Sequence, residues 1–164
     1  MQAEEPSGIR EAVAAHPLAE LLDCPPEAGV LLNGSARTVH LEAGERVFCQ
    51  GEPCTGLYLV VSGQFVRRTE RLKSRLTLGI VRPGDLVELA AALGDGVHTY
   101  TLSAQAAGSL LMLPIESLRG AFQTHPPLRM RLLEELAREV CRAYIACTQN
   151  PPVSRKHRNG HASA

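Results

Sequence analysis

Residues 41–53 read LEAGERVFCQGEP, and residues 57–63 follow shortly afterwards as LYLVVSG. Two kinds of segment alternate here: short runs of β-branched and aromatic residues, and glycine-containing turns. Glycine accepts a positive φ angle without steric cost, so Gly44, Gly51 and Gly63 are expected at turns between strands. Strands this short and this closely spaced are typical of antiparallel sheets. The stretch therefore predicts an antiparallel barrel or sandwich.

The same texture continues on both sides, from about residue 36 to residue 114. Pro83-Gly84-Asp85 marks another turn, and the Ala-rich segment from Glu88 to Gly96 predicts one or two helical turns between strands. The sequence thus predicts an α+β protein built on an antiparallel β-roll, or jelly roll. The expected strands are 36–41, 46–49, 56–61, 63–68, 74–81, 98–105 and 109–113.

Helical spacing of apolar residues appears at both ends of the strand region. A short N-terminal helix is expected over about 8–23, with Cys24-Pro25-Pro26 ending it. A short helix over 114–123 and a long one over about 127–148 follow the strands. The expected organisation is a partly disordered segment 1–15, one domain over 16–148 and a disordered polar tail over 149–164.

The long helix carries an apolar stripe whose members recur at alternating intervals of three and four residues. This spacing is typical of a helix that packs against a partner helix. A helix with two apolar faces can place one on its own roll and the other on a second copy, so we expect a homodimer. The predicted dimer stripe is Leu133, Leu136, Val140, Ala143 and Cys147.

Composition excludes several classes of function. The 164 residues carry 17 Lys and Arg against 17 Asp and Glu, whereas nucleic-acid-binding surfaces usually have a basic excess. Three Phe, three Tyr and no Trp leave little for a base-stacking platform. No apolar run reaches the length of a membrane span, and no secretory signal is visible. We therefore expect a cytoplasmic protein without a membrane partner.

The segments LEAGERVFCQGEP and LYLVVSG, followed by Pro83-Gly-Asp-Leu and the Ala-rich turn, resemble the cyclic-nucleotide-binding domain. The similarity is greatest to the sensor domain of the Crp/Fnr transcription regulators and covers about residues 16–147. It implies a lead-in helix, an eight-stranded β-roll and a long dimerisation helix. Members that act on DNA continue into a winged helix-turn-helix, whereas this chain ends 17 residues after Cys147. Direct DNA binding is therefore not expected of this chain alone.

The resemblance also implies where a ligand would bind. In the family, a short helix directs backbone N–H groups at the phosphate, an arginine pairs with it, and a glutamate accepts from the ribose 2′-hydroxyl. The corresponding residues here, in chain order, are Glu88 and Leu89, then His98 in place of the arginine and Thr99 after it.

Three departures from the family pattern weaken this cassette. Val87 stands where the family has glycine, and the segment from Gly84 to Glu88 is one residue short. His98 also lacks the arginine's charged fork, and losing one charged hydrogen bond weakens binding roughly 10- to 150-fold. The sequence therefore favours a non-catalytic regulatory or sensor module with a degenerate cassette, which signals through its long helix.

Two alternative functions remain open. Glu88, Leu89, His98 and Thr99 could still bind cyclic AMP or cyclic GMP, which is the small-molecule ligand that the resemblance implies. The chain could instead sense redox state, either through Cys147 at the dimer stripe or through Cys49 and Cys54 across their shared turn.

The sequence predicts no cofactor besides that cyclic nucleotide, and no metal site. Its five cysteines form no CxxC pair, which disfavours zinc, and only Cys24 precedes the strands, which disfavours an iron–sulfur cluster. A haem ligand needs an imidazole in an apolar pocket, and for His98, the best-placed histidine, a role in the pocket wall or at the surface is favoured. No nucleophile elbow, phosphate loop or metalloprotease motif appears, so we expect no enzymatic activity.

Overall fold

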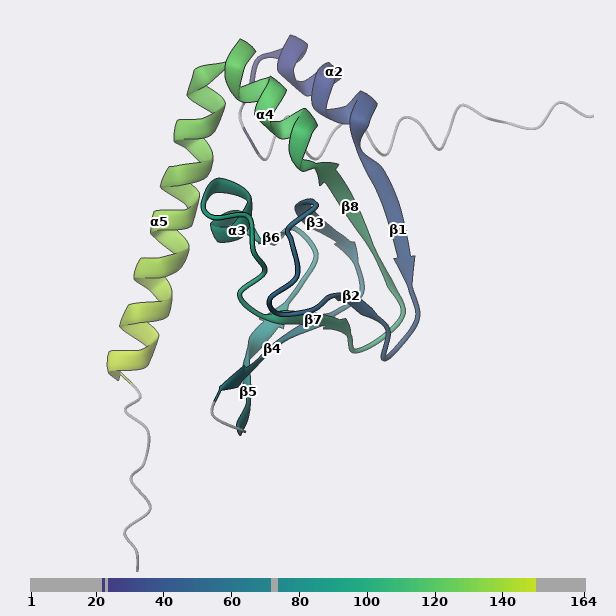
Figure 1. Ribbon diagram of the computed structural model, residues 1–164, viewed down its shortest axis with the longest axis vertical. Coiled ribbons are helices and arrows are strands. Elements are labelled where there is room, and N and C mark those ends of the chain that lie inside the picture. The colour runs from purple at the N-terminus through teal and green to yellow at the C-terminus, as the bar shows by residue number, and fades with distance from the viewer. Residues whose placement is uncertain (1–21, 23, 72–73, 150–164) are drawn as a thin grey trace, which may run out of the picture.

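The computed structural model of the chain describes residues 22, 24–71 and 74–149. Its strands form two four-stranded sheets that face each other as a roll, with helices on the outer side of one sheet (Figure 1). Every strand pair is antiparallel. The α+β class and the antiparallel β-roll that the sequence predicts are thus confirmed.

The two sheets draw their strands from distant parts of the chain. In spatial order, the first contains β1 (Arg37–Leu41), β8 (Gly108–Pro114), β3 (Gly56–Ser62) and β6 (Leu86–Val87). The second contains β2 (Arg46–Phe48), β7 (Thr101–Ala104), β4 (Phe65–Arg71) and β5 (Ser74–Val81). The described helices are α2 (Pro26–Ser35), α3 (Leu89–Leu93), α4 (Ile115–Thr124) and α5 (Pro126–Gln149).

Three turns of the roll close by the same device. In each, a carboxylate that directly follows a positive-φ glycine accepts a hydrogen bond from the backbone N–H three residues earlier. The glycine turns the chain, and the carboxylate satisfies a donor that the turn would leave unpaired. The donor–acceptor pairs are Glu42–Glu45, Cys49–Glu52 and Arg82–Asp85, at 2.7, 2.9 and 2.9 Å.

The strands β3 and β8 separate two apolar cores, because alternate side chains point to opposite faces of a sheet. Leu57, Leu59 and Leu113 lie in the core beneath the helices, together with Leu32, Leu118 and Leu132. Tyr58, Val60 and Leu110 lie inside the roll, together with Phe48, Phe65 and Leu102. The near-continuous apolar runs of β3 and β8 are explained by burial on both faces.

The helix α2 lies where the sequence analysis expected none. Its first residue is Pro26, which the sequence analysis took as the end of the preceding helix. Proline is tolerated in the first helical turn, because an N–H there has no partner within the helix. The predicted helix over 8–23 falls outside the described residues, except for the helical and buried Leu22. Segment 1–15 and residues 150–164 of the predicted tail also lie outside them.

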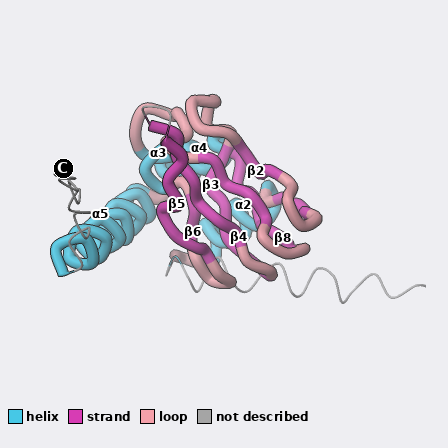
Figure 2. The backbone as a smooth tube through the Cα atoms, turned by 90° about the horizontal axis from the view of Figure 1, so that it is seen from below, coloured by secondary structure: helices cyan, strands magenta, loops and turns pink. Residues whose placement is uncertain are grey.

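The long helix α5 confirms the prediction over 127–148, and its 24 residues span about 36 Å. The strand β8 passes directly into α4, and only His125 separates α4 from α5. Leu132 of α5 is buried, whereas Val140 and Tyr144 are exposed. Figure 2 shows α5 projecting to one side of the roll. Within the described ranges, no helix combines the length and apolarity that crossing a bilayer requires.

Candidate functional site

The segment between β6 and α3 places Glu88 inside the roll. Glu88 has φ 75°, and it is the one described residue other than glycine in the left-handed region. That conformation costs a non-glycine residue about 1–2 kcal/mol. The residues on either side of Glu88 are both buried, but in different cores. Val87 lies in the roll core, and Leu89 lies in the core beneath the helices. The glutamate that the sequence assigned to ribose binding is therefore enclosed.

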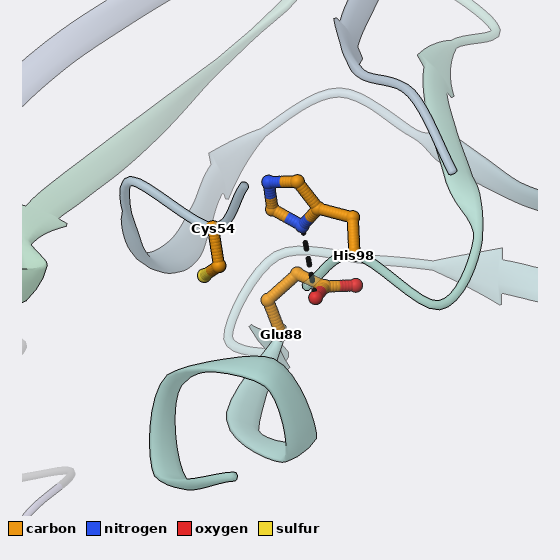
Figure 3. Close-up of side chains that lie close together, drawn as sticks. All are labelled: Cys54, Glu88 and His98. Atoms are coloured by element: carbon orange, nitrogen blue, oxygen red, sulfur yellow. Dashed lines mark ion pairs between the residues drawn. The ribbon is translucent and has the colours of Figure 1, made fainter. Parts of the chain in front are cut away.

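His98 lies directly against Glu88. The His98 Nδ1 and Glu88 Oε2 atoms are 2.9 Å apart, and the two side chains are 2% and 1% exposed (Figure 3). The pair is close, but it is not aligned for a hydrogen bond. Both carboxylate oxygens and Nδ1 are buried without an aligned partner. Sequence reasoning placed these residues at one site, but it did not predict that they would face each other.

Hydrogen bonds hold the backbone of His98, and an aromatic stack holds its ring. Its backbone N–H donates to Glu52 O at 2.9 Å, and its carbonyl accepts from Gly51 N at 2.8 Å. The imidazole stacks on Phe48, with ring centroids 3.8 Å apart and planes 5° apart. The predicted strand over 98–105 is wrong at its start: β7 begins only at Thr101, so His98 lies in the segment before it. The turn that contains Gly51 holds the segment in place instead.

Cys54 completes a cluster of three buried side chains. The Cys54 Sγ atom and the ligating atoms of Glu88 and His98 all lie within 4.8 Å of one another, although the residues come from three separate segments (Figure 3). The Cys54 thiol donates to Gly56 O at 3.2 Å. Burial raises the pKa of this thiol, and the charge of Glu88 raises it further. Cys49 and Cys54, proposed from the sequence as a redox pair, are both free thiols.

Tyr100 and Arg67 lie between Glu88 and the long helix in a series of polar and charged contacts. Burial raises the pKa of the Glu88 carboxyl, and His98, the Tyr100 hydroxyl and the Arg67 charge partly offset that rise. The Arg67 guanidinium lies 5.7 Å from the Tyr100 ring centroid, and it donates to Glu139 on α5 at 2.7 Å. Sequence reasoning missed Cys54, Tyr100 and Arg67 as neighbours of Glu88, because nothing in their spacing brings them together.

A large cavity lies elsewhere, between the roll and α5. Its volume is about 770 Å³, and Arg67, Asp85, Leu89 and Glu139 are among its lining residues. Glu88, His98 and Thr99 are not among them. Of the four predicted ligand residues, the structure therefore brings together only Glu88 and His98. Leu89 belongs to the core, and Thr99 is exposed.

The predicted dimer stripe divides between two faces of α5. Leu136 packs against the core beneath the helices, and Ala143 lines the cavity on the side of the roll. Leu133 is half-buried, and Val140 is 58% exposed. The side chain of Cys147 lies outside what the structure describes. The heptad-like spacing thus contains residues that α5 uses on its own roll.

Residues 38–125 match the family model of the cyclic nucleotide-binding domain, which covers more than half of the chain. The chain belongs to the cyclic nucleotide-binding domain family. Among curated proteins, it is 32% identical over 104 residues to "Patatin-like phospholipase domain-containing protein 7" of Rattus norvegicus. That alignment covers 58% of this chain but only 8% of the relative. The likeness is therefore confined to this one domain.

Solved structures show the same fold. The Thermus thermophilus catabolite activator protein has a TM-score of 0.68 at 25% identity, over 81% of this chain and 62% of that one. The sensor domain of the regulator DNR from Pseudomonas aeruginosa has a TM-score of 0.71 at 21% identity, over 88% and 98%. The resemblance to Crp/Fnr regulators is confirmed. The part of the chain that the structure describes contains no helix-turn-helix domain.

Proposed function

We propose that this member of the family is a cytoplasmic, non-catalytic regulatory module whose cassette no longer binds a cyclic nucleotide. The burial of Glu88 against His98 carries this proposal. A ribose hydroxyl would have to reach a carboxylate whose side chain is 1% exposed, and His98 would have to separate from it. The position that holds the family's arginine offers an enclosed imidazole with no charged fork.

The roll and α5 provide a route for a signal. Arg67 on β4 and Glu139 on α5 form an ion pair at 2.7 Å, both residues line the cavity, and Arg67 also lies beside Tyr100. A molecule or partner segment that enters the cavity must displace or join this ion pair. We propose that such an event moves α5 relative to the roll, and that this movement is the output of the module.

We further propose that α5 pairs with α5 of a second copy. Its roll-facing side is occupied by Leu132, Leu136 and the cavity residues, so a partner has to use another side. From Met130 onward, residues spaced alternately by three and four positions form an exposed or half-exposed stripe, which is the spacing of a coiled coil. The stripe is Met130, Leu133, Ala137, Val140 and Tyr144.

Titration calorimetry tests the cassette. We expect neither cyclic AMP nor cyclic GMP to bind the full chain, and a dissociation constant below about 10 µM for either would overturn the proposal. A related cyclic nucleotide-binding domain that keeps the glycine and the arginine serves as the positive control. Sedimentation velocity tests the second part: we expect a dimer at micromolar concentration, and a monomer would refute the pairing of α5.

A further inference from the structure

The cluster of Cys54, Glu88 and His98 has the composition of a metal site. It offers one thiol sulfur, one carboxylate and one imidazole, all buried, with the ligating atoms within 4.8 Å of one another. Zn²⁺ takes these three kinds of ligand at about 2.0–2.3 Å, usually in tetrahedral arrangement. Ligands at those bond lengths lie less than 4 Å apart, so small side-chain shifts bring all three atoms onto one ion.

A second observation concerns the same atoms. Both oxygens of Glu88 and the Nδ1 atom of His98 are buried and make no well-aligned hydrogen bond to each other, although Nδ1 and Oε2 are 2.9 Å apart and the Tyr100 hydroxyl also interacts with Glu88. Buried polar atoms in folded proteins nearly always have a partner, so each such atom requires an explanation. We propose that Cys54, Glu88 and His98 together bind one divalent transition-metal ion of the zinc class.

The charges of this assembly suit its burial. When the metal–sulfur bond forms, the Cys54 S–H bond breaks and its proton passes to solvent. A thiolate, a carboxylate and a neutral imidazole then balance the two positive charges of the ion. A neutral buried assembly avoids the cost of an isolated buried ion. The thiolate and imidazole favour zinc over Mg²⁺ or Ca²⁺, which prefer all-oxygen sites.

The surrounding structure already holds the three ligands. The backbone N–H of Cys54 donates to Gly96 O at 2.7 Å, which joins the thiol-bearing turn to the segment that leads to His98. The stack on Phe48 fixes the plane of the His98 ring. Such outer contacts orient metal ligands and strengthen binding. The inference rests on the proposed function in one respect: Glu88 must not be engaged by a ribose.

The test uses the full chain, stripped of metal by a chelator and titrated with Co²⁺ and then Zn²⁺. We expect one Co²⁺ per chain, with a thiolate-to-cobalt charge-transfer band in the near ultraviolet that Zn²⁺ abolishes. Cys54→Ser should lose the band and weaken Co²⁺ binding by at least about tenfold. Cys49→Ser, at the other end of the same turn, is the matched control and should keep both.

X-ray absorption of the zinc-loaded wild-type chain tests the site without any variant, so it remains informative if Cys54→Ser fails to fold. It should show one sulfur and at least two nitrogen or oxygen ligands. A band that survives in Cys54→Ser, a spectrum without sulfur, or no binding below about 10 µM would each overturn the site. Cyclic AMP calorimetry on the stripped and zinc-loaded chains separates the two proposals. If no metal binds, only this site is refuted. If the nucleotide binds, the proposed function is refuted.

Discussion

The Arg67 guanidinium donates to the Glu139 carboxylate at 2.7 Å, and this contact joins strand β4 to helix α5. Both groups are more than half shielded from solvent, at 25% and 38% side-chain exposure. Burial alone would lower the pKa of the Arg67 guanidinium, but its hydrogen bond to Glu139 and the nearby charges raise it above the usual value. This salt bridge connects the roll to the long helix.

A double-mutant cycle of Arg67→Gln and Glu139→Gln should therefore give a coupling energy of about 0.5–1 kcal/mol in urea unfolding. Arg138→Gln with Glu135→Gln is the control, because that pair lies within α5 and is more exposed, and its coupling should be smaller. Equal coupling in the two cycles would contradict a linking role for Arg67.

Leu132 should account for much of the packing of α5 on its own chain. Leu132→Ala empties a position that is 1% exposed, and we expect the free energy of unfolding to fall by about 2–5 kcal/mol. Val140→Ala on the exposed side of the helix should change it by less than about 0.5 kcal/mol in dilute protein. Similar losses from both variants would mean that α5 is not seated as described.

The exposed stripe of α5 should control assembly without affecting the fold. Tyr144 is 70% exposed, and Tyr144→Glu should shift dimers to monomers in sedimentation velocity, because two like charges would meet at the helix pair. Val30→Glu places the same charge on α2 at a residue that is 73% exposed, and it should leave the dimer intact. If neither variant alters the sedimentation of a dimeric wild type, the interface lies elsewhere.

Gly63 and Gly44 both have positive φ, but they differ in surroundings. A Cβ on Gly63 would lie 2.7 Å from Gly108 Cα, whereas one on Gly44 would meet nothing within 4 Å. Gly44→Ala should therefore cost only the backbone strain, about 1–2 kcal/mol, and Gly63→Ala should cost clearly more. Thermal unfolding measures both, and equal losses would show that the approach of Gly63 to Gly108 is not tight.

The fold could be predicted because its signals are local. The residue after a turn glycine is acidic at Glu45, Glu52 and Asp85, and each acid closes its own turn. Helix α2 was missed for an equally local reason. Pro25-Pro26 was taken as the end of a helix, but proline is also suited to the first turn of a new one. The heptad-like spacing could not show which side of α5 its own roll occupies.

The site was less predictable, because its geometry depends on contacts between distant segments. Glu88 and His98 were paired by family resemblance, and the sequence could not show that their side chains would be enclosed and in contact. Cys54 reaches the same space from a turn 34 positions before Glu88. No periodicity relates these positions, since the sheets bring them together only after the roll has closed.

Because β8, α4 and α5 follow one another almost without a loop, a small rotation between them produces a large displacement at the end of α5. From Gly108 to Gln149, His125 alone belongs to no strand or helix, so little of this span can absorb a change of angle. With an arm of about 36 Å, a rotation of roughly 10° at that joint would swing the far end of α5 by about 6 Å. If α5 pairs as proposed, a displacement too small to unseat a core side chain would realign the two subunits.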